Sequence, residues 1–184
     1  MKKLILIIIF FGLGTNLFAQ TKVDSLLFKK INEYRANNHL YKLFYRKDAY
    51  KASSDYSKYA SKKNISDFRN YYGGYWEFDN RCERINKHYA LCKEINILIS
   101  SETKLSDDSL SKIVFYRWIN GKSSKEIILD KKMSFGAISN STSNYITIRE
   151  NSHKFFEVER EPEVIIDTKK GYYYWVNLFL YRKL

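Results

Sequence analysis

The spacing of apolar residues predicts helices in the first two thirds of the chain. Over residues 25–37, apolar side chains recur at intervals of four and three, which places them on one face of a helix. Over residues 48–62, two alanines and a tyrosine are spaced by four. A third helix is expected to start after a Ser106 cap and to run through Trp118.

Less regular segments separate these helices. Residues 64–80 carry Gly73-Gly74 between aromatic residues and are expected to form a long surface loop. Residues 82–92 are compatible with a short helix. Ser123 and Glu126 match the reciprocal capping pattern, which predicts a fourth helix through residue 129.

The last third of the chain reads as strands. The pattern predicts extended segments at residues 95–99, 134–138, 144–149, 155–160, 163–166 and 172–181. Lys169-Lys170-Gly171 is expected to form a turn before the last of these. Helices early and strands late favour an α/β or α+β sandwich over regular βαβ repeats.

The first 19 residues have the order of a cleavable secretory signal. Lys2 and Lys3 are followed by the apolar run 4–11, and Ala19 supplies a small residue before Gln20. The run is shorter than the roughly 20 residues that a spanning helix needs, which disfavours the alternative of an uncleaved anchor. We therefore expect a secreted or periplasmic protein cut near Ala19-Gln20, with no transmembrane span in the mature chain.

Residues 20–184 have a length that suits a single domain with its own core. The chain carries 32 Lys and Arg against 20 Asp and Glu. A positive field favours an anionic lipid, an anionic cell-wall polymer or nucleic acid as partner, with solubility and non-specific attraction as the alternative reading. The lysines are scattered and form no block of five or more, which argues against a nucleic-acid arm. Tyrosine is abundant, with 16 residues, and suits half-exposed surfaces.

Cys82 and Cys92 are the only cysteines. A pair in an exported chain permits a disulfide, which would close a short loop. Two cysteines without neighbouring paired histidines are a weak basis for a metal site, and no metal or cofactor is expected.

Several segments, in order along the chain, resemble the CAP superfamily, also called the SCP-like domain. These segments are Ile31-Asn32-Glu33-Tyr34-Arg35-Ala36, Glu94-Ile95-Asn96-Ile97, Arg117-Trp118-Ile119-Asn120 with Glu126-Ile127-Ile128-Leu129, Phe135-Gly136-Ala137, and the aromatic run 172–179. The resemblance implies a three-layer α-β-α sandwich with a central, mostly antiparallel sheet. The stretch between Ile138 and Lys170 is longer than the family usually has, which implies an extra hairpin or a lengthened pair of strands.

The resemblance also implies a site, and here the sequence departs from the family. Many CAP domains hold two histidines and two acidic residues that can bind a divalent metal. The position of the later histidine is occupied by Ser124, and no histidine occurs between His39 and His88. Only Glu94 of the expected set is retained, as a candidate catalytic residue or as a structural carboxylate.

Three functions follow as hypotheses. The first is a non-enzymatic exported module that binds a ligand or partner, with Tyr72, Tyr75 and Trp76 as the surface to test. The second is a hydrolase with a rearranged centre around Glu94, joined by His88. The third is a basic adhesin or toxin-like factor whose partner is a protein.

Overall fold

The computed structural model describes residues 20–64, 73–85, 91–150 and 164–182. The predicted signal segment, Tyr72, His88 and the predicted strand at 155–160 lie outside these residues. The elements follow one another as α2 (Lys22–Asn37), β1 (Phe44–Tyr45), α3 (Lys47–Lys63), α4 (Gly73–Ile85), β2 (Leu91–Ser101), α5 (Asp107–Asn120), α6 (Lys122–Ile128), β3 (Phe135–Glu150) and β4 (Val164–Arg182).

The four strands form one sheet in the order β1-β3-β4-β2. The short β1 is parallel to β3, and the other neighbours are antiparallel. β4 lies in the centre and pairs along its length, with Glu94 of β2 opposite Phe179 and Asn96 opposite Asn177. The expected mostly antiparallel sheet is therefore confirmed.

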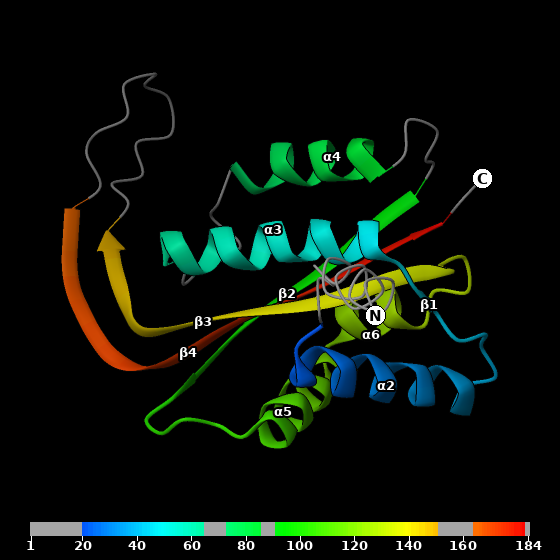
Figure 1. Ribbon diagram of the computed structural model, residues 1–184, viewed down its shortest axis with the longest axis horizontal. Helices are drawn as coiled ribbons and strands as arrows, with labels where there is room; N and C mark the ends of the chain where they lie inside the picture. Colours follow the sequence, from blue (N-terminus) through cyan, green and yellow to red (C-terminus); the bar gives the residue numbers. More distant parts are fainter. Residues whose placement is uncertain (1–19, 65–72, 86–90, 151–163, 183–184) are drawn as a thin grey trace, which may run out of the picture.

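β3 and β4 continue as a long antiparallel ribbon beyond the end of β2 (Figure 1). Over this ribbon Tyr145 pairs with Lys170 and Thr147 with Thr168. The segment between Ile138 and Lys170 is thus a lengthened pair of strands in its described part. The turn predicted at Lys169-Gly171 is wrong, because these residues lie within β4, where Lys169 and Lys170 pair with Ile146 and Tyr145 of β3.

Helices cover both faces of the sheet (Figure 1). On one face, α2, α5 and α6 enclose the larger core, which includes Leu27, Val114 and Ile128. On the other face, α3 packs directly on β3 and β4, with Ala49 and Ala52 against the sheet, and α4 lies beside α3 and contacts the sheet through Phe78. Small side chains on α3 allow this close approach. The arrangement is the three-layer α-β-α sandwich that was expected.

The predicted helices are found at the expected positions in the chain, but their first and last residues differ from the prediction. The predicted helices at 25–37 and 48–62 correspond to α2 and α3, and Ser106 caps α5 as expected. α2 begins earlier than predicted because Thr21 and Asp24 form a capping box, in which each side chain accepts from the other's backbone N–H.

Two predictions for the middle of the chain are wrong. The expected loop at 64–80 contains the start of α4, and the expected helix at 82–92 ends at Ile85, so that Cys92 belongs to β2. The apolar positions Phe78, Cys82 and Ile85 recur at intervals of four and three and pack on the core. The glycine pair marks the first turn of this helix and does not interrupt it.

The capping pattern predicted for α6 is also wrong. Its cap is Gly121, and no side chain satisfies the free N–H groups there. Ser124 instead donates from Oγ to the carbonyls of Trp118 and Gly121, at 2.6 and 3.1 Å, and so ties α6 to the end of α5. Among the residues that the structure describes, no helix has the length and apolar character needed to cross a bilayer.

Candidate functional site

Glu94 lies near the start of β2 on the face of the sheet that α3 and α4 cover. Its cross-strand neighbour Phe179 packs on that same face against Phe78 of α4, with ring centroids 6.0 Å apart. The side chain of Glu94 is 10% exposed. A carboxylate this deeply buried needs partners for both of its oxygens.

Arg81 of α4 supplies the main partner. Its Nη2 lies 2.6 Å from Oε1 of Glu94, and its side chain is 2% exposed. The guanidinium carbon also lies 4.7 Å from the centroid of the Tyr56 ring on α3, a cation–π geometry. The ion pair therefore joins α4 directly to β2, beside Tyr56 of α3.

Two asparagine amides complete the cluster. Asn177 of β4 donates to Oε1 of Glu94 at 2.6 Å, and Asn96 donates to Oε2 at 3.4 Å. The backbone of Asn177 is held in turn, because Ser53 of α3 donates to its carbonyl at 2.8 Å. Glu94 is thus the centre of a polar network that joins the sheet, through β2 and β4, to the helices α3 and α4.

The protonation of Glu94 follows from this environment. Burial raises the pKa of its carboxyl above the ordinary value, while the positive charge of Arg81 and hydrogen bonds from Asn177, Asn96 and Arg81 act in the opposite direction. The groups that lower the pKa are one arginine and two asparagines, each of which donates a hydrogen bond to the carboxylate.

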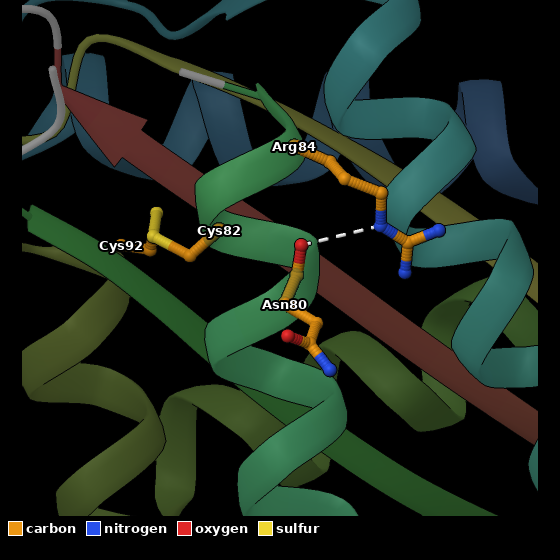
Figure 2. The surroundings of a disulfide bond; sticks show 4 residues. All are labelled: Asn80, Cys82, Arg84 and Cys92. Carbon is orange, nitrogen blue, oxygen red and sulfur yellow. Dashed lines mark hydrogen bonds between the residues drawn. A yellow bond between two sulfur atoms is a disulfide. The ribbon is translucent and has the colours of Figure 1, made fainter. Parts of the chain in front are cut away.

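A disulfide closes one end of this network. Cys82, the residue after Arg81, is bonded to Cys92, two residues before Glu94. Figure 2 shows Cys82 on the side of α4 that faces Cys92, with Arg84 on the opposite side, where its Nε donates to the carbonyl of Asn80. The disulfide therefore holds the part of α4 that carries Arg81 close to the start of β2, which carries Glu94.

A small pocket of about 100 Å³ opens between α3 and α4. It is lined by Asp48, Lys51, Ala52, Asp55, Arg81, Arg84 and Ile85. Arg84 and Asp55 form an ion pair across it at 3.8 Å. Glu94 is not part of its lining.

The residues present do not fit the divalent metal that the CAP resemblance implies. The guanidinium of Arg81 is bound to Glu94, and its positive charge would repel a cation there. Ser124 lies in α6, on the opposite face of the sheet, so no side chain at that position faces Glu94. Among the described residues, no group of three or more His, Cys, Asp and Glu side chains is placed to hold a metal.

Of the predicted site residues, the structure joins Cys82 to Cys92, with Glu94 two residues further along β2. His39 is exposed at the end of α2, while His88 and His153 lie outside the described residues. Tyr75 and Trp76 fall in the first turn of α4, whose backbone alone is described there, and Tyr72 lies outside.

Sequence reasoning missed two members of the network, Arg81 and Asn177. Asn177 carried a signal, because it is a lone amide in the apolar run 172–181. Arg81 carried a weaker one, since it lies three residues after Phe78 on the inner face of α4.

Comparison with solved structures shows what this fold is similar to. An extracellular protein from Bacillus anthracis that contains an SCP domain matches with a TM-score of 0.54 at 13% identity, over 89% of this chain and 41% of that one. An outer surface protein from Borrelia burgdorferi matches with a TM-score of 0.53 at 19% identity, over 86% of this chain and 92% of that one. No family model and no curated protein matches the sequence. The chain therefore has a CAP/SCP-like fold and spans less than half the length of the Bacillus protein.

Proposed function

We propose that this chain is an exported, non-enzymatic binding module of the cell envelope, built on a CAP-like scaffold whose inherited site has become structural. The observation that carries the proposal is the contact between Arg81 and Glu94. Both oxygens of Glu94 accept hydrogen bonds from within the protein, from Arg81, Asn177 and Asn96, which supports a role in holding the fold together.

Export is supported by the sequence and by the neighbours. Residues 1–19 have the composition of a leader, and Cys82 and Cys92 are bonded, as suits an oxidising compartment. The Bacillus neighbour is an extracellular protein and the Borrelia neighbour an outer surface protein. Mass measurement of the protein recovered outside the cytoplasm tests this part, with an N-terminus at Gln20 expected.

The absence of catalysis at Glu94 is tested with Glu94→Gln. The substitution removes the charge and keeps the shape, so it abolishes any general acid or nucleophilic role. We expect no hydrolysis of peptide, ester or glycan substrates above background by either protein. Turnover by the wild type that Glu94→Gln loses, with the fold intact, would establish an enzyme and sink the proposal.

The alternative is a hydrolase with a rearranged centre. One observation favours it: Glu94 is a buried carboxyl with a raised pKa, a property that catalytic acids share. It is the weaker candidate because the adjoining pocket is lined by Arg81 and not by Glu94.

The aromatic residues Tyr72, Tyr75 and Trp76 stay a proposed binding surface. Replacement of Tyr75 and Trp76 by alanine, followed by binding to peptidoglycan and to anionic vesicles, tests that surface. Binding that is unchanged in this double variant would exclude it.

A further inference from the structure

The link between α2 and α3 carries two exposed aromatic side chains at the open edge of the sheet. Tyr41 is 94% exposed and Phe44 is 67% exposed. Burying a phenylalanine stabilises a fold by about 1.5–3 kcal/mol. Single exposed rings are common on protein surfaces, however, so their meaning depends on how they are held and on what lies beside them.

The backbone of this link is pinned. Asn32 of α2 accepts from the N–H of Leu43 at 2.7 Å and donates to its carbonyl at 3.1 Å. Leu43 is buried, and neighbouring side chains of an extended chain point in opposite directions. Lys42 and Phe44 therefore face outward as a consequence of the fold.

Pairing with β3 fixes the position of Phe44 further. Its N–H donates to the carbonyl of Ser134 at 2.9 Å, and its ring lies 6.1 Å from that of Phe135. Figure 1 shows β1 beside the beginning of β3, at the edge of the sheet.

Arg35 brings a second segment to the same place. Its buried guanidinium donates to the carbonyl of Tyr41 at 3.0 Å, and to those of Asp130 and Met133 at 3.2 and 3.1 Å. Lys131 and Lys132 lie between the last two acceptors and are exposed. We call Tyr41, Lys42, Phe44, Lys131 and Lys132 the Tyr41 surface.

The positive charge of the Tyr41 surface is only partly balanced by nearby acids, where Asp130 attracts Lys132. Asp130, the acid nearest to its lysines in the chain, is paired with Lys93 at 2.7 Å. Asp48 is paired with Arg46 at 3.1 Å. None of Lys42, Lys131 and Lys132 forms an ion pair with another residue in the described part of the chain. Two protruding rings are thus accompanied by three exposed lysines.

We propose that the Tyr41 surface docks on a bilayer that contains anionic phospholipid. Aromatic rings favour the headgroup region, where their apolar bodies leave water, and each nearby lysine adds about 1 kcal/mol of attraction to an anionic leaflet. Tyr41 stands clear of the protein, so it can enter the headgroup layer without rearrangement. This inference rests on the proposed binding function and names its surface and partner.

The test is co-sedimentation of the protein, in the form that a producing cell yields, with phosphatidylcholine vesicles made with or without an equimolar share of phosphatidylglycerol. The wild type is expected to bind the anionic vesicles and to release them as salt is raised. Tyr41→Ala with Phe44→Ala, and separately Lys131→Glu with Lys132→Glu, are each expected to weaken binding by about tenfold or more.

Matched controls separate the surface from bulk charge. Tyr116→Ala removes a ring of comparable exposure from α5, and Lys58→Glu with Lys62→Glu makes the same charge change on α3. Both controls are expected to bind like the wild type. All variants share one N-terminus, so residues 1–19 contribute equally wherever they are retained. Tyr41→Ala alone keeps the test valid if the loss of Phe44 disturbs folding, because its ring has almost no contacts to lose.

Four results would overturn the proposal. The first is that the wild type does not bind anionic vesicles, and the second is that the α3 control loses as much binding as the Tyr41 variants. The third is that binding is lost only in Tyr75→Ala with Trp76→Ala. The fourth is that the wild type binds an anionic wall polymer and does not bind vesicles. A hydrolase activity that depends on Glu94 would end the proposed function, yet it would leave the difference between the Tyr41 variants and their controls in place.

Discussion

Arg81 and Glu94 form a buried ion pair, with Nη2 and Oε1 2.6 Å apart, and their side chains come from different layers of the sandwich. One partner lies on α4 and the other on β2, and the disulfide between Cys82 and Cys92 lies beside both. The pair therefore fixes how α4 sits over the sheet. It also occupies the carboxylate that a CAP-type metal site would use.

Breaking this pair from the arginine side should be costly. Arg81→Met leaves the Glu94 carboxylate buried without its cation, and we expect a loss of about 3–5 kcal/mol in the free energy of unfolding. Urea denaturation measures the change. The double variant Arg81→Met with Glu94→Leu should recover part of the loss, because no charge then remains buried. Adding the effects of the two single substitutions gives an expected stability for the double variant. If the double variant is less stable than this expectation, a stabilising interaction between Arg81 and Glu94 is contradicted.

The guanidinium of Arg35 should not be replaceable by an ammonium. Its fork of donors serves the carbonyls of Tyr41, Asp130 and Met133, and a lysine cannot reach all of them at once. Arg35→Lys is therefore expected to destabilise the fold by about 2–4 kcal/mol through unsatisfied buried carbonyls. The exposed Arg117→Lys on α5 is the matched control and should shift the unfolding midpoint little. Equal midpoints for the two variants would show that the fork is not needed.

Because of Asp24, the fold should be more stable at mildly acidic pH than at neutral pH. Burial raises its pKa from 3.8 to about 6, against hydrogen bonds from Asn140 and Thr21. Between these two values the folded chain binds more protons than the unfolded chain, so stability falls as pH rises through this window. The contribution at pH 5 should exceed that at pH 7 by about 1 kcal/mol.

Denaturant unfolding of the wild type and of Asp24→Asn at the two pH values measures this difference. The variant has no titrating group at the position and should lose about 1 kcal/mol of the pH dependence. Asp48 and Asp130 do not confuse the comparison. Their pKa values are lowered, so their contributions are lost only at more acidic pH. An identical pH dependence in both proteins would contradict the raised pKa of Asp24.

Reduction of the disulfide should loosen α4 and weaken the whole domain. Cys82 and Cys92 are 10 residues apart, and closing a loop of this size stabilises the folded state by about 2–3 kcal/mol in the chain-entropy description. The variant with serine at both positions should show this loss, and added reductant should lower the stability of the wild type only. A wild type that is insensitive to reductant would show that the bond does not form or does not matter.

The sequence by itself determined the elements whose signals are local. Apolar spacing and a good cap lie within one or two turns, so α2, α3 and the Ser106 start of α5 were predictable, as was the apolar strand that ends the chain. The motifs that resemble the CAP family also predicted the three-layer fold. The leader at residues 1–19 and the binding role stay predictions.

Only the tertiary structure decided which side chains meet. Glu94 and Asn177 are 83 positions apart, and their contact depends on the register of β2 against β4, which no local pattern encodes. The same holds for Arg35, which joins Tyr41 to the turn before β3. The sheet also separates Ser124 from Glu94, because a residue's face is set by strand and helix packing and not by its place in a motif. The partners of Glu94 come from α4 and β4, so they become visible only once these elements are packed together.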